Sequence, residues 1–161
     1  MVVKVDLSFC TVYNNADVKL IISFLEFTRR HNMTIKIAII DDDRHLTMLL
    51  SSILEADGFK VYATNNSTEY SILISKAEPD LIILDWMMPD MDGIEVLTAL
   101  KGNEVFKHIP VIMLTTKNML NEVNRLFTAG ADDYICKPFN ASLIGKQIRD
   151  KLEKYKKRHE K

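Results

Sequence analysis

Four short segments of the chain each end at side chains that could take part in chemistry. These side chains are Asp41, Asp42 and Asp43 after residues 35–40, Asp85 after residues 81–84, Thr115 after residues 111–114, and Lys137 after residues 133–136. Clustered carboxylates repel one another unless a cation compensates their charge. Mg²⁺ prefers hard oxygen ligands and accepts only one or two protein carboxylates. If the segments are neighbouring strands, the combination predicts a site for Mg²⁺ and a phosphoryl group.

Each residue type has a chemical role at such a site. Asp85 would be the nucleophile that attacks a phosphoryl group and forms an aspartyl phosphate. The ammonium group of Lys137, together with Mg²⁺, would neutralise the charge on the phosphoryl oxygens. The hydroxyl of Thr115 could donate a hydrogen bond to one of these oxygens. Asp43 and Asp92 have a simpler explanation, because a carboxylate after a strand often caps the next helix.

The segments belong to a longer alternation of apolar runs and helical patterns. The predicted strands are residues 35–40, 59–63, 81–84, 111–114 and 133–136. Apolar residues at helical spacing predict a helix after each strand, and Asn66 with Glu69 resembles a capping pair ahead of the second helix. This order predicts an α/β fold, a doubly wound five-stranded parallel sheet with helices on both faces. Such sheets bind ligands beyond the carboxyl ends of their strands, which is where the candidate residues lie.

Composition narrows the class of protein. The chain has 161 residues, of which 47% are hydrophobic and 27% charged, as in ordinary globular domains. Its apolar runs are far shorter than the roughly 20 residues that span a membrane, and its N-terminus lacks the pattern of a secretion signal. Cys10 and Cys136 make neither a disulfide framework nor a zinc site, and Cys136 is expected in the core. We therefore expect a soluble, cytoplasmic protein without a membrane segment.

The C-terminal part of the chain is basic, although the net charge is −1. Residues 146–161 contain eight Lys or Arg residues against three Asp or Glu residues. A basic segment can bind nucleic acid or an anionic membrane, but this one is short and carries no base-reading motif. We interpret it as the solvated end of a final helix, with residues 156–161 as a basic tail or the start of a linker. No direct nucleic acid binding by this segment is expected.

Four motifs occur in the order and spacing of a known family. IIDDD, LDWMMPDMDG, VIMLTT and YICKPF together strongly resemble the receiver domain of two-component response regulators, as found in chemotaxis regulators. The resemblance covers residues 34–155 and implies the flavodoxin-like receiver fold. It implies a phosphoprotein of phosphorelay signal transduction, which catalyses only its own phosphoryl transfer and dephosphorylation and is otherwise no enzyme.

The resemblance also implies partners. The phosphoryl group would come from a histidine kinase or a histidine phosphotransfer protein. The signal would pass to a downstream output protein or to a covalently linked output domain. The sequence leaves open whether the receiver stands alone or belongs to a longer regulator.

The resemblance assigns metal and phosphate roles to four residues. Asp85 matches the phosphoacceptor, which also faces the metal. Asp42 matches the direct Mg²⁺ ligand, and Asp41 matches the carboxylate that usually acts through water. Met87 matches the position whose backbone carbonyl completes the metal site.

Three further residues match the machinery that responds to the phosphoryl group. Thr115 matches the switch hydroxyl, Tyr134 the switch aromatic residue, and Lys137 the phosphate-binding lysine. The peptide bond between Lys137 and Pro138 is usually cis in this family.

The haloacid-dehalogenase-like phosphatases give an alternative interpretation, in which Asp41 is the nucleophile. Their first motif is Asp-x-Asp-x-Thr after a strand, and a Thr or Ser and then a Lys follow later in the chain. Asp41, Thr115 and Lys137 imitate these parts, but His45 stands where the first motif has Thr. The acidic pair expected after the lysine is missing, and LDWMMPDMDG stays unexplained. The receiver interpretation is therefore favoured.

Residues 1–33 precede the receiver pattern and form a predicted N-terminal extension. Apolar and polar residues alternate over residues 3–9, which predicts a half-buried strand, and Val18 to Leu25 show the spacing of an amphipathic helix. The extension could lengthen the sheet, cover a helix face or pair two copies in a homodimer. An over-extended upstream start is a further alternative, and the sequence does not choose among these.

Overall fold

The computed structural model describes residues 34–116 and 120–159. The predicted strand and helix of the N-terminal extension lie outside the described residues. Contacts within residues 34–161 define one compact unit of the chain. In the described part of the chain, no helix has the length and apolar character needed to cross a membrane.

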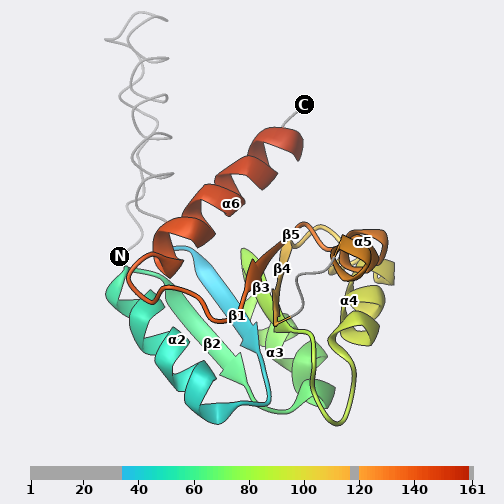
Figure 1. The fold of residues 1–161 in the computed structure, drawn as a ribbon, viewed down its shortest axis with the longest axis horizontal. Coiled ribbons are helices and arrows are strands. Elements are labelled where there is room, and N and C mark those ends of the chain that lie inside the picture. The colour runs from blue at the N-terminus through green and yellow to red at the C-terminus, as the bar shows by residue number, and fades with distance from the viewer. Residues whose placement is uncertain (1–33, 117–119, 160–161) are drawn as a thin grey trace, which may run out of the picture. The chain divides into compact units, whose positions relative to one another are not determined.

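A five-stranded parallel sheet forms the centre of this unit (Figure 1). Its strands are β1 (Lys36–Ile40), β2 (Lys60–Thr64), β3 (Leu81–Asp85), β4 (Val111–Thr115) and β5 (Asp133–Cys136). They lie in the order β2-β1-β3-β4-β5, and every neighbouring pair is parallel. The doubly wound sheet predicted from the alternation is confirmed.

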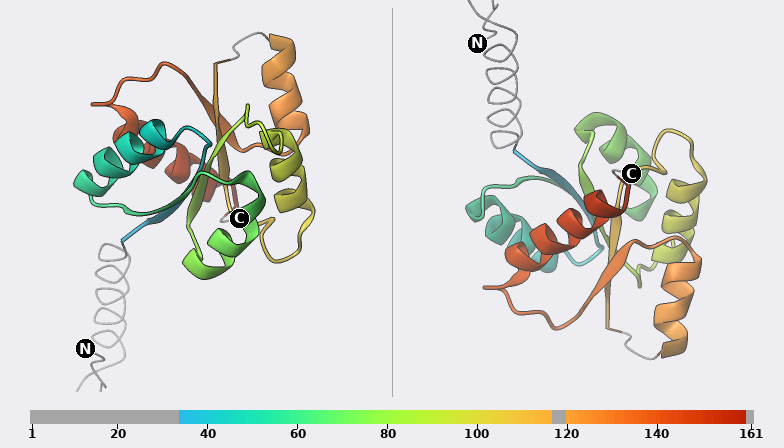
Figure 2. Two further views of the ribbon diagram at one scale, coloured as in Figure 1. Left: turned by 90° about the horizontal axis from the view of Figure 1, so that it is seen from below. Right: turned by 90° about the horizontal axis from the view of Figure 1, so that it is seen from above.

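Helices cover both faces of the sheet (Figure 2). They are α2 (Arg44–Ala56), α3 (Tyr70–Ala77), α4 (Gly93–Gly102), α5 (Leu120–Thr128) and α6 (Ile144–His159). Buried residues of α2 and α6 pack on one face, and buried residues of α3, α4 and α5 pack on the other. Because both faces are covered, β3 and β4 are buried along their whole length.

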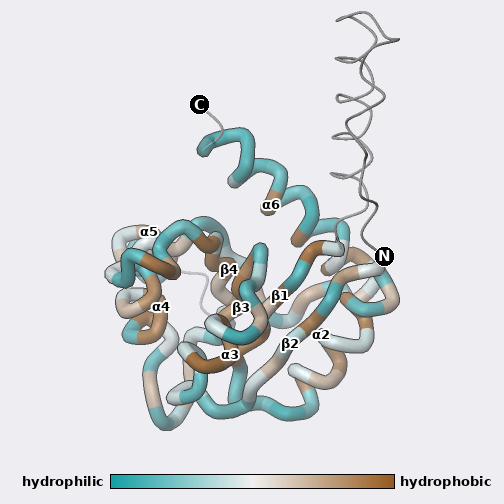
Figure 3. Tube along the Cα trace, turned by 180° about the vertical axis from the view of Figure 1, so that it is seen from behind, coloured by the Kyte–Doolittle hydropathy of each residue, from teal (hydrophilic) through white to brown (hydrophobic). Residues whose placement is uncertain are grey.

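The two faces receive alternate residues of each strand. On β1, Ile37 and Ile39 pack with α2 and α6, whereas Ala38 and Ile40 pack with the other three helices. This is the period of two that an extended strand imposes on its side chains. The apolar strands therefore stand out in brown at the centre of the hydropathy view, while most of α6 is hydrophilic (Figure 3).

The helix ends follow the expected capping chemistry, with one difference. Asp43 and Asp92 are the N-caps of α2 and α4, as predicted. The Asp43 carboxylate accepts from two backbone N–H groups of the first turn, and the Asp92 carboxylate accepts from one. Asn66 caps a short 3₁₀ helix, η2 (Ser67–Glu69), instead of opening α3 directly. The reason is local, since Asn66 Oδ1 accepts from the backbone N–H of Thr68 and so tightens the turn.

The C-terminal helix continues beyond the predicted end of the receiver. α6 runs through Tyr155 to His159, so the segment assigned to a basic tail begins within the helix. The hydroxyl of Tyr155 donates to the backbone oxygen of His108 at 2.7 Å, which ties this last part of α6 to the loop before β4.

Candidate functional site

The predicted site residues meet at the carboxyl edge of the sheet. Asp41 follows β1, Asp85 ends β3, Thr115 ends β4 and Lys137 follows β5. Lys137 Nζ lies 2.8 Å from Asp41 Oδ2 and 2.6 Å from Asp85 Oδ1. The backbone N–H of Lys137 donates to the backbone oxygen of Thr115 at 2.7 Å. One ammonium group thus bonds two carboxylates that lie at the ends of neighbouring strands, β1 and β3.

Three carboxylates at this edge are close enough to share a cation. Asp41, Asp42 and Asp85 each offer an oxygen, and these oxygens all lie within 4.8 Å of one another. Asp41 and Asp85 are buried, at 1% and 5% exposure, while Asp42 is exposed. Hard oxygen donors that reach solvent on one side suit Mg²⁺, which retains several waters. The residues present therefore fit this ion.

The environment of Asp85 makes ionisation of its carboxyl less favourable than in water. Burial raises the pKa of the Asp85 carboxyl above its usual value of 3.8, and the neighbouring charge of Asp41 adds to the increase. The hydrogen bond and the charge of Lys137 act in the opposite direction but do not cancel the rise. A cation beside this carboxylate would relieve the cost of ionising it.

Lys137 is in the opposite position, because it is held between two acids. Burial lowers the pKa of its ammonium group, but hydrogen bonds to Asp41 and Asp85, and the charges of both, outweigh burial and raise the pKa above 10.5. Lys137 therefore stays charged at neutral pH.

The loop after β3 folds back tightly over the end of that strand. The backbone N–H of Gly93 donates to the backbone oxygen of Trp86 at 2.8 Å. A Cβ atom at Gly93 would lie 2.0 Å from the backbone oxygen of Asp85, a distance that no side chain permits. Residue 93 must therefore be glycine for the loop to close beside the carboxylate.

Met87 lies within this loop, two residues after Asp85. Its backbone N–H donates a hydrogen bond to the Asp85 carboxylate, and the residue is 61% exposed. The thioether therefore points mainly to solvent. The implied metal role of the Met87 carbonyl stays a prediction.

Thr115 and Tyr134 lie on the same face of the sheet. Thr115 is 2% exposed and alternates in step with Val111 and Met113, which face α3, α4 and α5. The half-buried Tyr134 packs against the same cluster. Its ring makes an edge-to-face contact with Phe127 of α5, with centroids 6.0 Å apart. Thr115 and Tyr134 therefore face the same layer of helices.

One expectation at this edge is wrong. Cys136 was expected in the core, but it is exposed. It is the last residue of β5, an edge strand that pairs on one side only. Burial along β5 ends at Ile135, and Cys136 beyond it is exposed. The Lys137–Pro138 peptide bond, in contrast, is cis, as the resemblance implied.

Sequence reasoning missed Asn65 and its partner Thr47, which support the acidic loop. Asn65, directly after β2, donates from Nδ2 to the backbone oxygen of Asp41 and to Oγ1 of Thr47, both at 2.8 Å. Asn65 follows a strand at the same edge as the other candidates, and that placement was the available signal.

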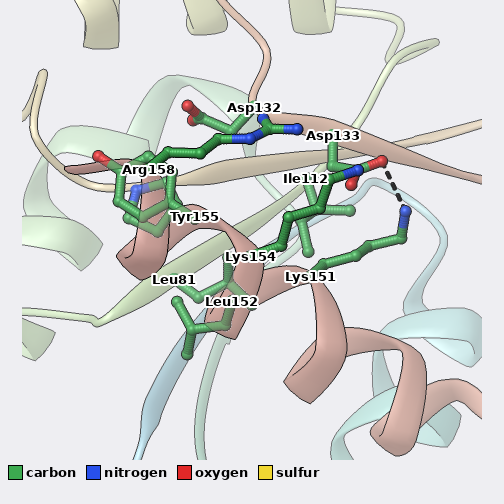
Figure 4. Close-up of a pocket in the computed structure, with 10 residues that line it drawn as sticks. Leu81, Ile112, Asp132, Asp133, Lys151, Leu152, Lys154, Tyr155 and Arg158 are labelled. Carbon is green, nitrogen blue, oxygen red and sulfur yellow. Dashed lines mark hydrogen bonds and ion pairs between the residues drawn. The ribbon is translucent and has the colours of Figure 1, made fainter. Parts of the chain in front are cut away.

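A small cavity lies at the other end of the sheet (Figure 4). Its lining includes Leu81, Ile112 and Asp133, which stand at or near the starts of β3, β4 and β5. The Lys151–Asp133 ion pair borders it. With a volume of about 10 Å³, it has room for little more than one water molecule. It is therefore no ligand site.

Fold and site together define the class of protein. The strand order β2-β1-β3-β4-β5 with an acidic cluster and a lysine at its carboxyl edge is that of the CheY-like flavodoxin fold. The family profile described as the response regulator receiver domain matches residues 37–149. The chain belongs to this family and is a receiver domain of the two-component response regulators.

Curated relatives agree with the family. The chain is 37% identical over 121 residues to the phosphate regulon transcriptional regulatory protein PhoB of Rhizobium meliloti, covering 75% of this chain and 53% of the relative. It is 33% identical over 119 residues to the DNA-binding response regulator MtrA of Mycobacterium tuberculosis, covering 74% of this chain and 51% of the relative. The chain thus spans about half the length of these relatives.

Solved structures support the same assignment. The chemotaxis response regulator CheY4 of Vibrio cholerae superposes with a TM-score of 0.70 at 28% identity, over 74% of this chain and 99% of that one. The signal receiver domain of a histidine kinase from Syntrophus aciditrophicus gives a TM-score of 0.66 at 34% identity, over 74% and 90%. Nothing in these comparisons favours the phosphatase alternative with Asp41 as nucleophile.

Proposed function

We propose that this receiver domain accepts a phosphoryl group on Asp85, with Mg²⁺ held by Asp42, Asp85, the Met87 carbonyl and, through water, Asp41. The observation that carries the proposal is the position of Asp85. Asp85 is buried, at 5% exposure, and its carboxylate lies 2.6 Å from the Lys137 ammonium group. This carboxylate also lies in a cluster with two further carboxylates, whose oxygens are all within 4.8 Å of one another.

The proposed transfer is a displacement at phosphorus. An oxygen of Asp85 forms the new P–O bond, while the bond from phosphorus to the donor atom breaks and the donor leaves with the electron pair. When bound, Mg²⁺ would screen the negative charge of the phosphoryl oxygens. Lys137, already beside Asp85, would pair with one of these oxygens, and the Thr115 hydroxyl would donate to another.

The same groups suggest how the domain switches. We propose that the phosphoryl group draws Thr115 toward it and so frees space that Tyr134 can fill. Thr115 and Tyr134 share one face of the sheet, and Tyr134 contacts Phe127, so the change would reach the surface formed by α5, β5 and α6. Such a switch shifts the populations of two packings and does not require refolding.

The proposed partners follow from this chemistry. The donor would be a histidine kinase or a histidine phosphotransfer protein, and the receiver of the signal an output protein or a linked output domain. We propose a cytoplasmic location, where such donors act, and no direct nucleic acid or membrane binding by the described residues.

Phosphorylation by a small phosphodonor distinguishes the receiver function from the phosphatase alternative with Asp41 as nucleophile. The full chain, Asp85→Asn and Asp41→Asn are incubated with acetyl phosphate and Mg²⁺, and intact mass reports the fraction of phosphorylated protein. We expect phosphorylation of the wild-type chain, none of Asp85→Asn, and a reduced rate for Asp41→Asn. Phosphorylation that persists in Asp85→Asn but is lost in Asp41→Asn would instead favour the phosphatase alternative.

A further inference from the structure

Asn65 connects the acidic loop to α2 by hydrogen bonds that fix the orientation of its side chain. A backbone carbonyl only accepts, so the amide nitrogen of Asn65 must face the oxygen of Asp41. Thr47 Oγ1 donates its proton to the backbone oxygen of Arg44 at 3.0 Å, and therefore accepts from Asn65. The bonds are mutually consistent, with Asn65 donating twice.

The bond to the Asp41 oxygen acts on the peptide that leads into Asp42. The Asp42 side chain is exposed and, among the described residues, makes no hydrogen bond or ion pair. Its position is therefore set by its backbone. The Asp41 carboxylate, in contrast, is held directly by the backbone N–H of Asp43 at 2.9 Å and by Lys137. Asn65 supplies the support that Asp42 lacks.

Thr47 holds the Asn65 side chain in place from a buried position on α2. Thr47 is 3% exposed and lies in the first turns of α2, so its position is fixed by packing. The backbone N–H of Asp41 donates to the oxygen of Thr64 at 3.3 Å, which places the loop beside the end of β2. The Asn65 amide thus joins the end of β2, the acidic loop and α2.

We propose that Asn65 is a positioning residue of the metal site, which holds the Asp41–Asp42 peptide so that the Asp42 carboxylate meets the ion. This inference rests on the proposed function, because it takes Asp42 as a Mg²⁺ ligand. Groups that orient metal ligands change metal affinity by about 10–100-fold. Since Asn65 acts through one backbone carbonyl, the effect expected on Mg²⁺ affinity is about tenfold.

Two pairs of variants isolate the contribution of Asn65. Asn65→Ala removes both donors. Asn66→Ala is the matched control, because the Asn66 side chain bonds Thr68 and Glu69 of the same loop and not the acidic segment. Thr47→Val removes the hydroxyl that Asn65 contacts, whereas Thr47→Ser keeps it. The Thr47 pair keeps the inference testable if Asn65→Ala fails to fold.

The measurement is the dissociation constant of Mg²⁺ by calorimetry on the full chain, with thermal unfolding in EDTA as the measure of stability. We expect Asn65→Ala to weaken binding about tenfold and Asn66→Ala to leave it nearly unchanged. Thr47→Val should weaken binding, and Thr47→Ser should restore it. With acetyl phosphate, Asn65→Ala should need more Mg²⁺ for half-maximal phosphorylation but reach the same rate at saturation.

The inference is overturned if Asn65→Ala binds Mg²⁺ as tightly as the wild-type chain. It is also overturned if Asn66→Ala, at an equal loss of thermal stability, weakens binding as much, because the effect would then be that of a loosened loop. If the wild-type chain neither binds Mg²⁺ nor becomes phosphorylated, the proposed function fails. Intact wild-type binding with an unaffected Asn65→Ala refutes the role of Asn65 alone.

Discussion

Lys137 Nζ lies 2.6 Å from Asp85 Oδ1, although the two residues are 52 positions apart in the chain. The contact exists because β3 and β5 are parallel and end at the same edge of the sheet. The same ammonium group bonds Asp41 at 2.8 Å, so one cation compensates two buried carboxylates. A phosphoryl group on Asp85 would add negative charge beside the Lys137 ammonium group, which is already in place to compensate it.

This arrangement predicts that Mg²⁺ can partly replace Lys137 in compensating the charges of Asp41 and Asp85. Lys137→Met leaves Asp41 and Asp85 without their shared cation, so we expect the free energy of unfolding in EDTA to fall by about 3–5 kcal/mol. Mg²⁺ binds the folded state and compensates the same carboxylates, so it should restore much of the loss. Urea denaturation with and without Mg²⁺ measures both quantities.

Lys101→Met is the control for this experiment. Lys101 is as buried as Lys137 and pairs with Asp132 at 2.7 Å, but it lies on α4, outside the acidic cluster. Lys101→Met should lower the free energy of unfolding. Mg²⁺ should then stabilise this variant only as much as it stabilises the wild-type chain, and so leave the loss in place. An equal response of both variants to Mg²⁺ would contradict the shared role of Lys137.

A second prediction follows from the raised pKa of Asp85. Between 3.8 and the higher native pKa, the folded state binds more protons than the unfolded state. The contribution of Asp85 to the free energy of unfolding therefore decreases as pH rises through this interval. Asp85→Asn removes the ionisation, so its stability relative to the wild-type chain should increase with pH.

The measurement is urea denaturation of both proteins in EDTA at several values between about pH 4 and about pH 7. We expect Asp85→Asn to be the more stable protein near neutral pH, with a difference that shrinks at the acidic end. A difference that stays constant with pH, or that has the opposite sign, would show that burial does not penalise the Asp85 charge.

Gly93 provides a prediction about the loop that closes over the site. A methyl group there would overlap the backbone oxygen of Asp85, so Gly93→Ala should cost about 2–3 kcal/mol of stability. Gly102→Ala is the control, because a Cβ at Gly102 meets nothing within 4 Å and alanine favours the helix. Thermal unfolding distinguishes them, and equal effects would mean that the loop moves freely away from Asp85.

Much of this architecture was predictable because its signals are local. Asp43 and Asp92 follow strands and precede helical patterns, and both cap helices as expected. The alternation of strands and helices was enough to predict the parallel sheet. Because Lys137 and Asp85 both stand at the ends of predicted parallel strands, they were also expected to lie close together. The failures depend on tertiary context. Cys136 looked like a core residue in sequence, but it ends the edge strand and is exposed.

The supports of the site were less accessible to sequence reasoning. Gly93 resembles any glycine at the start of a helix until the backbone oxygen of Asp85 is placed beside it. The Asn65 amide bonds Thr47, 18 positions earlier. Side chains that act by holding a backbone carbonyl carry no motif, since many residue types fit a turn and only the folded geometry shows what they hold.

The proposed switch predicts different responses of two tyrosines. Tyr134 packs beside the face that carries Thr115, whereas Tyr62 lies on β2 at the opposite edge of the sheet. Addition of beryllofluoride with Mg²⁺ should change the NMR signals of Tyr134 and Phe127 and leave those of Tyr62 nearly unchanged. Thr115→Ala should reduce the response of Tyr134. If Tyr134 responds fully without the hydroxyl, Thr115 does not couple the site to this face.

In the proposed function, Asp85 and no other carboxylate receives the phosphoryl group. The most direct test is to phosphorylate the full chain with acetyl phosphate and Mg²⁺, reduce the acyl phosphate with borohydride, and locate the resulting homoserine by peptide mass spectrometry. We expect homoserine at position 85 and none at positions 41 or 42, with no product when Mg²⁺ is removed by EDTA. Homoserine at position 41, or a product that forms equally well in EDTA, would contradict the proposed function.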